Sequence, residues 1–249
     1  MQDLIPHESS PRAVDNSVRF VHETAERHAS SRVQSFIDAE LYKPSKAWVY
    51  DVLESKRECE SVRLRTSDFV LLPDINANRR QFRQQWRPTL KKTEDEDEPP
   101  EELVGLPRWA AASTVTRRPF QFSYQHRTFN WLSIILDPTL RTIRDLRAEH
   151  LPMLEDMYEQ CLNAIEAEFG LKRHDVMVFA NYPPSVYRLH FHFCAPFHCV
   201  GAFDAFRMHS FHTIANNLRL CPNYYAESTM CVPVHCNSEL HRALTQDDT

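Results

Sequence analysis

Glycine is scarce in this chain, with only 3 in 249 residues. P-loops and dinucleotide-binding fingerprints need several glycines at fixed spacing, so the sequence excludes both kinds of phosphate site. Long apolar runs are also missing, and the first residues show no basic segment followed by an apolar stretch. We therefore expect neither a membrane span nor a secretion signal.

An excess of positive charge is missing too, because the formal net charge is −5. Proteins that hold long nucleic acid through its phosphates are usually strongly basic, so we expect no long nucleic acid as a partner, while a short nucleotide ligand stays open. The seven cysteines include no Cys-x-x-Cys pair and are typical of reduced thiols in an intracellular protein. Zinc remains an alternative for one group of residues, but without paired ligands we expect no metal site. That group comprises Cys194, His198, Cys199, Cys231, His235 and Cys236.

The segment Tyr187–Phe193, which reads Tyr-Arg-Leu-His-Phe-His-Phe, is the most informative feature. Side chains alternate along a strand, so His190 and His192 share one face while the apolar residues between them share the other. Burying an imidazole without a partner costs on the order of 1–3 kcal/mol. The pattern therefore predicts a binding or catalytic site at this strand.

Helical spacing of apolar residues predicts a long helix over residues 17–41 and a second helix over 45–57, with Ser45 as its N-cap. The best-supported helix covers 148–169 and is closed by Gly170. A last helix is expected over 203–218. We expect strands at 62–64, 68–74, 128–137, 176–180, 187–195 and 229–234.

These elements predict an α+β fold with an antiparallel sheet and one long packed helix. We expect an N-terminal helical segment over 1–45 and a main domain over 46–245. Residues 75–128 combine several arginines with an acidic run and two prolines, so this block cannot build a core. We interpret it as a charged, flexible insertion, with a regulatory or partner-binding role as the alternative.

The order of strands, long helix and His-φ-His strand resembles the histidine-triad hydrolases, and within them the scavenger mRNA-decapping enzymes. Several separate motifs carry this resemblance in the same order along the chain. They are Trp48-Val49-Tyr50 with Glu58, the strand Asp68–Asp74, the segments Ile143–Leu146 and Glu149–Pro152, the loop Tyr182–Ser185 before the histidine strand, and Asn217-Leu218 with Cys221–Tyr225.

The resemblance implies hydrolysis of short capped mRNA remnants, m7GpppN, to m7GMP and a nucleoside diphosphate. His190 then stands at the position of the nucleophile, which would form a nucleotidyl-histidine intermediate. His192 would hold phosphate oxygens or protonate the leaving phosphate. Ser185 would hydrogen-bond the phosphates. No cofactor is implied.

For the methylated base, the resemblance assigns stacking to Trp48, and an indole is a good partner for a cationic purine. Glu58 would accept hydrogen bonds from the guanine edge. Asp74 stands at a further cap-binding position. Read without the resemblance, Trp48 could be a core residue, Glu58 a solvated charge and Asp74 a turn residue.

Departures from the family pattern weaken the expectation of turnover more than that of binding. Arg188 replaces the first histidine of the triad, although a guanidinium can itself bind phosphate. Asn76 stands where the family has a phosphate-directed lysine, and Asn181 and Val186 replace a histidine and a tyrosine. About 47 residues precede Trp48, fewer than a full N-terminal domain of the family.

Three functions stay open: a cap-scavenging pyrophosphatase, a catalytically weak cap- or nucleotide-binding protein, and a generic hydrolase of dinucleoside polyphosphates. The expected ligand is a capped mononucleotide or a short capped oligoribonucleotide. A homodimer and a cytoplasmic or nuclear location are expected from the resemblance alone.

Overall fold

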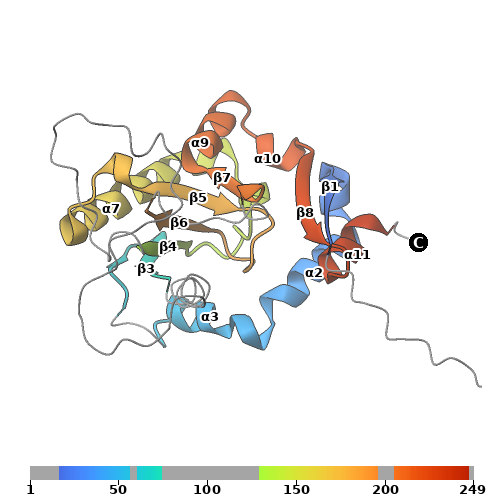
Figure 1. Ribbon diagram of the computed structural model, residues 1–249, viewed down its shortest axis with the longest axis horizontal. Helices are drawn as coiled ribbons and strands as arrows, with labels where there is room; N and C mark the ends of the chain where they lie inside the picture. Colours follow the sequence, from blue (N-terminus) through green and yellow to red (C-terminus); the bar gives the residue numbers. More distant parts are fainter. Residues whose placement is uncertain (1–16, 57–60, 75–128, 196–204, 247–249) are drawn as a thin grey trace, which may run out of the picture.

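A six-stranded antiparallel sheet forms the centre of the molecule, as Figure 1 shows for the computed structural model. The structure describes residues 17–56, 61–74, 129–195 and 205–246. The strand order is β2–β3–β4–β6–β5–β7. The strands are β2 (Leu64–Arg65), β3 (Phe69–Pro73), β4 (Asn130–Ile135), β5 (Met177–Asn181), β6 (His190–Cys194) and β7 (Met208–Ser210).

Alternate residues of the central strands enter two separate apolar clusters. Phe69 and Leu71 of β3 belong to the larger cluster, whereas Val70 and Leu72 belong to the smaller one. This split follows from the two-residue period of a strand. Since both faces are covered, these strands are continuously apolar in sequence rather than alternating.

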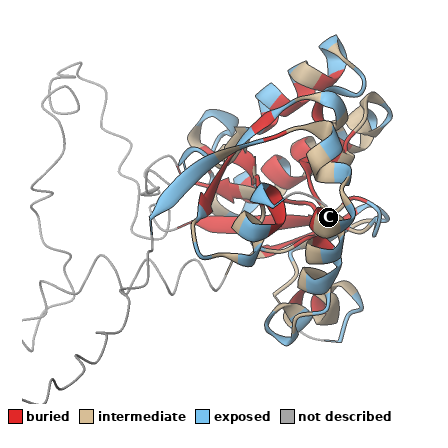
Figure 2. Cartoon of the chain, turned by 90° about the vertical axis from the view of Figure 1, so that its right-hand side faces the viewer, coloured by how far each residue is buried: buried red, intermediate tan, exposed pale blue. Residues whose placement is uncertain are grey.

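The long helix α7 (Leu151–Phe169) covers one face of the sheet and supplies six buried residues. It ends at Gly170, whose φ of 70° lies in the left-handed region that glycine adopts readily. The short helix α3 (Ala47–Leu53) covers part of the other face through Val49 and Val52. Figure 2 shows the buried residues concentrated in the sheet and in the helix faces turned toward it. The sheet is therefore the middle layer of three.

A second sheet has two strands, β1 (Val18–Glu23) and β8 (Met230–His235), and lies to the right of the main sheet in Figure 1. Val33 and Ile37 of the helix α2 (Ser31–Leu41) reach the larger core cluster. The remaining helices are α1 (Ala25–Ala29), α9 (Phe211–Leu220), α10 (Tyr224–Glu227) and α11 (Glu239–Thr245), with 3-10 turns η1 (Pro44–Lys46), η2 (Ile143–Asp145), η3 (Ala148–His150) and η4 (Arg173–Asp175).

The α+β class, the antiparallel sheet and the long helix ending at Gly170 are confirmed. None of the helices described could cross a membrane, since each is too short or too polar. The insertion predicted over 75–128 lies outside the described residues.

Three local predictions are wrong. The first part of the helix expected over 17–41 is the strand β1, because Val18–Glu23 pairs with β8 near the other end of the chain. The helix expected over 203–218 begins only at Phe211, because Met208–Ser210 pairs with β5. Ser45 lies inside a 3-10 turn, so the N-cap of α3 is Lys46 instead.

Candidate functional site

Strand β6 places both predicted imidazoles on the face of the sheet that α3 partly covers. His190 pairs with Ile134 and His192 pairs with Leu132, and both partners belong to the cluster that contains Val49 of α3. The two imidazole rings lie 5.3 Å apart, centroid to centroid. The spacing of the histidines in the sequence thus becomes one compact pair in space.

Burial and hydrogen bonding fix the protonation state of His190, which is 8% exposed. Its Nδ1 lies 2.7 Å from the backbone carbonyl oxygen of Arg188. A carbonyl can only accept, so Nδ1 carries the hydrogen and Nε2 keeps its lone pair. Burial lowers the pKa of His190, and the charges of Arg207 and Lys46 lower it further against the opposing effects of that hydrogen bond and of Asp74. A neutral imidazole with an available lone pair can act as a nucleophile.

Lys46 and Arg207 bind the loop that precedes the histidine strand. The Lys46 ammonium donates to the carbonyl oxygen of Ser185. The Arg207 guanidinium donates twice to the carbonyl oxygen of Pro183, at 3.0 and 2.7 Å. Two cations from distant parts of the sequence therefore meet near His190, and such a group favours a phosphate ligand.

His192 is held by two neighbours from β5. Its ring stacks on Phe179 with centroids 5.0 Å apart and planes 12° apart. The side-chain amide of Asn181 lies 3.3 Å from His192 Nε2. The other end of this amide, Asn181 Oδ1, is buried without a hydrogen-bond partner. Asn181 Oδ1 is thus a buried acceptor without a partner among the described residues.

Arg188, which the resemblance aligns with the first histidine of the triad, contacts Leu136 and the α3 residue Tyr50. Its guanidinium donates to the carbonyl oxygen of Leu136 at 3.3 Å and lies 5.9 Å from the ring centre of Tyr50. Burial lowers the pKa of Arg188, against the charges of Tyr50 and Asp137. An arginine stays charged even so, which a histidine at this position would not do at neutral pH.

Of the other predicted binding residues, some lie near the histidines and the rest lie outside the described residues. Trp48 on α3 is half-buried against the cluster that backs the imidazoles, and Ser185 is exposed at the loop. Asp74 follows β3, and its Oδ2 lies 3.5 Å from the amide of Asn130. Structure therefore brings Trp48, Asp74, Ser185 and Arg188 to the neighbourhood of the histidines. Glu58 and Asn76 lie outside the described residues.

Sequence reasoning missed Lys46, Arg207 and Phe179. Lys46 had a weak signal, because it stands two residues before the candidate stacking residue Trp48. Arg207 had none, since its place depends on the pairing of β7 with β5. Within the ranges described, no three metal-binding side chains gather in one place.

A long helix against an antiparallel sheet, with a His-φ-His strand at its centre, is consistent with the histidine-triad class. Within this class, the model for "Scavenger mRNA decapping enzyme C-term binding" matches residues 120–204. Over these residues the chain is similar to the scavenger mRNA decapping family.

Curated relatives with the name m7GpppX diphosphatase agree with this placement. The protein from Ascaris suum is 36% identical over 91 residues, which is 36% of this chain and 30% of the relative. The human protein is 25% identical over 204 residues, 80% of this chain and 47% of the relative. The rat protein is 24% identical over 232 residues, 91% and 55% respectively. The chain thus spans about half or less of the length of the relatives it matches.

Proposed function

We propose that this chain hydrolyses the triphosphate bridge of short capped RNA remnants, m7GpppN, to m7GMP and a nucleoside diphosphate. The observation that carries the proposal is His190: a buried, neutral imidazole, beside a second imidazole and under the charge of Lys46 and Arg207. Its relatives bear the name m7GpppX diphosphatase, and the chemistry of the site fits that activity.

In the proposed reaction, Nε2 of His190 attacks the phosphorus bonded to the 5′ oxygen of 7-methylguanosine. A nitrogen–phosphorus bond forms, and the bridging phosphorus–oxygen bond breaks. The leaving nucleoside diphosphate takes up a proton, for which His192 is the nearest candidate donor. Water then breaks the nitrogen–phosphorus bond, which releases m7GMP and restores the free imidazole.

Lys46, Arg188 and Arg207 stabilise the charge that builds up on the phosphate oxygens. Trp48 stacks on the methylated base, whose positive charge favours an indole face. In this proposal Asp74 and Ser185 hydrogen-bond the bound nucleotide, and Glu58 and Asn76 keep the roles that the family resemblance implies.

The permanent charge of Arg188 favours a second candidate, a protein that binds caps with little turnover. A triad histidine can exchange a proton with the phosphates during the reaction, whereas Arg188 cannot. A generic hydrolase of dinucleoside polyphosphates is the third candidate. Incubation with m7GpppG and with GpppG, followed by chromatography of the products, distinguishes the three.

The decisive variant is His190→Asn, which keeps a polar side chain but removes the nucleophile. We expect turnover of m7GpppG to fall by at least about 10³-fold while calorimetry still detects cap binding. His22→Asn, an exposed histidine on β1, is the matched control and should keep wild-type turnover. Unchanged turnover in His190→Asn would show that another group attacks the phosphorus.

A further inference from the structure

The carboxylate of Glu23 connects the two-stranded sheet to the loop that precedes the histidine strand. Glu23 is the last residue of β1 and is 2% exposed. Its Oε2 accepts a hydrogen bond from the hydroxyl of Tyr182, the residue that follows β5. His28 Nδ1 lies 3.0 Å from the other carboxylate oxygen, Oε1. A residue of the small sheet, 159 positions away in the sequence, is thus bonded to the first residue of the loop.

The hydrogen bond between Tyr182 and Glu23 is buried and has a fixed direction. Burial, and then the charge of Glu23, raise the pKa of Tyr182 well above its ordinary value, so the hydroxyl keeps its proton and donates it. Hydrogen bonds to an ionised acceptor are roughly twice as strong as those between neutral groups. The Arg144 guanidinium completes the group, because it donates to the same hydroxyl at 3.3 Å and to Glu23 Oε2 at 3.2 Å.

Tyr182 is also bonded to Arg207, one of the cations near His190. The backbone N–H of Tyr182 donates to the backbone carbonyl oxygen of Arg207 at 2.8 Å. In the other direction, the Arg207 guanidinium donates to the carbonyl oxygen of Pro183 at 3.0 and 2.7 Å. Both the backbone and the side chain of Arg207 therefore depend on where the loop begins, so a shift of Tyr182 would move this cation.

The other end of the loop is held by Lys46, which donates to the carbonyl oxygen of Ser185. In the proposed reaction Lys46, Arg207 and Ser185 act on the phosphates of the substrate. A displacement of about 1 Å in such a group can cost on the order of 10²-fold in rate. The anchor at Tyr182 therefore matters for function as well as for stability.

We propose that Glu23 and Tyr182 are positioning residues for the phosphate site: the hydrogen bond between them fixes the start of the loop Tyr182–Ser185 and, through it, the place of Arg207. Neither residue needs to touch the substrate. The inference rests on the proposed cap hydrolysis. It makes β1, which lies outside the main sheet, a part of the structure on which phosphate binding depends.

The test uses Tyr182→Phe, which removes the hydroxyl and keeps the ring, and compares two ligands by calorimetry, m7GDP and 7-methylguanosine. We expect m7GDP to bind about tenfold more weakly than to the wild type. The affinity for 7-methylguanosine should not change, because Trp48 packs on the cluster of β3 and β4 and not on the loop. The value of kcat/KM for m7GpppG should fall by about the same factor as the m7GDP affinity.

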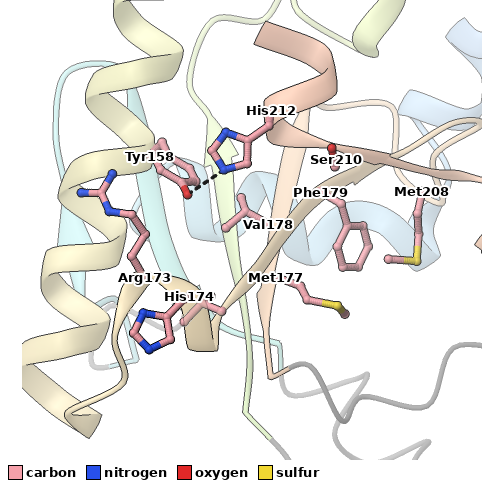
Figure 3. Close-up of a pocket in the computed structure, with 10 residues that line it drawn as sticks. Tyr158, Arg173, His174, Met177, Val178, Phe179, Met208, Ser210 and His212 are labelled. Atoms are coloured by element: carbon pink, nitrogen blue, oxygen red, sulfur yellow. Dashed lines mark hydrogen bonds between the residues drawn. The ribbon is translucent and has the colours of Figure 1, made fainter. Parts of the chain in front are cut away.

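The matched control is Tyr158→Phe on α7, the helix on the other face of the sheet. Tyr158 is 5% exposed and Tyr182 is 4% exposed. The Tyr158 hydroxyl also has a hydrogen-bond partner, since it lies 3.2 Å from His212 Nε2 (Figure 3). This variant should keep wild-type affinity for both ligands, which separates the role of Tyr182 from the general cost of removing a buried hydroxyl.

Glu23→Gln tests the same hydrogen bond from its other end, and it replaces Tyr182→Phe if that variant does not fold. It should weaken the binding of m7GDP alone, by about threefold, because a neutral amide oxygen is the weaker acceptor. The double variant should lose no more m7GDP affinity than Tyr182→Phe, because both changes act on one hydrogen bond. Losses that multiply, an equal loss for both ligands, or wild-type m7GDP affinity in folded Tyr182→Phe would overturn the inference.

The outcome can be told apart from that of the proposed hydrolysis. If the wild-type protein binds m7GDP but does not cleave m7GpppG, the hydrolysis is refuted, and the two affinities still decide whether Glu23 and Tyr182 position the loop. A wild-type protein that binds m7GDP no more tightly than 7-methylguanosine would overturn the inference too, because the loop would then hold no phosphate.

Discussion

Replacing Arg144 by methionine should destabilise the fold more than any single change at the surface. The Arg144 side chain is 1% exposed and that of its ion-pair partner Glu23 is 2% exposed. Arg144 also donates to the backbone carbonyl oxygens of Glu23, Tyr225 and Ser228 at 2.7, 3.1 and 2.6 Å, and to the Tyr182 hydroxyl at 3.3 Å. One guanidinium thus connects β1, the residue that follows β5 and the segment around α10.

The size of the effect follows from what Arg144→Met leaves behind. Two buried carbonyl groups and a part-buried one lose a donor. The Glu23 carboxylate also loses its cation, so we expect a loss of about 3–5 kcal/mol in the free energy of unfolding. Glu23→Gln should cost less, about 1–3 kcal/mol, because Arg144 keeps its carbonyl partners. Burial by itself would raise the pKa of Glu23, but hydrogen bonds with His28 and Tyr182 and the charge of Arg144 outweigh it and lower that pKa.

Urea unfolding at neutral pH, followed by circular dichroism, measures both variants and the double variant. The double variant should lose about 1–3 kcal/mol less than the sum of the single losses, because no buried carboxylate remains without its cation. If Glu23→Gln proved more damaging than Arg144→Met, or if the two losses simply added, the network would not work as argued.

Two further predictions concern pH. His209 is half-buried, and its partial removal from water lowers its pKa from 6.5 to about 4. Between these two pH values the unfolded chain binds up to one more proton than the folded chain, so the free energy of unfolding decreases as the pH falls from 6.5 to 4, by about 3 kcal/mol at most. Urea unfolding of His209→Gln at several pH values should lack this part of the decrease. A pH dependence of stability equal to that of the wild type would contradict the prediction. The lowered pKa of His190 should keep kcat/KM high below pH 6.5. Arg207→Gln should move the acid limb of the pH profile of kcat/KM to higher pH, because one of the charges that lower this pKa is lost. An acid limb that stayed in place or moved to lower pH would refute the role of Arg207.

Local pattern was enough to predict the centre of the fold. Strand β6 and helix α7 carry their signals in contiguous residues, namely alternation around His190 and His192 and apolar spacing up to Gly170. The pairing of the two imidazoles followed from strand geometry alone. The resemblance supplied Trp48, which packs on the face of the sheet that holds them.

Long-range pairing is what the sequence could not reveal. Val18 and Val21 stand three residues apart, as in a helix, yet they lie in β1 because this segment pairs with β8. β8 is more than 200 residues away along the chain, so the local pattern could not indicate this pairing. The same limit hid β7, and with it the place of Arg207 beside the histidine loop. Local periodicity carries no information on which distant segment will complete a sheet.

The cations near His190 serve the proposed chemistry in two ways at once. Lys46, Arg188 and Arg207 each donate to a backbone carbonyl oxygen, which holds these cations in place. In the proposed reaction, their charge attracts the phosphates of the substrate before any bond is broken. The charges of Lys46 and Arg207 also disfavour protonation of His190, which helps to keep the attacking imidazole neutral. Exchange of a triad histidine for Arg188 adds to the first effect, so the loss of one titrating imidazole is compatible with retained attack by the other.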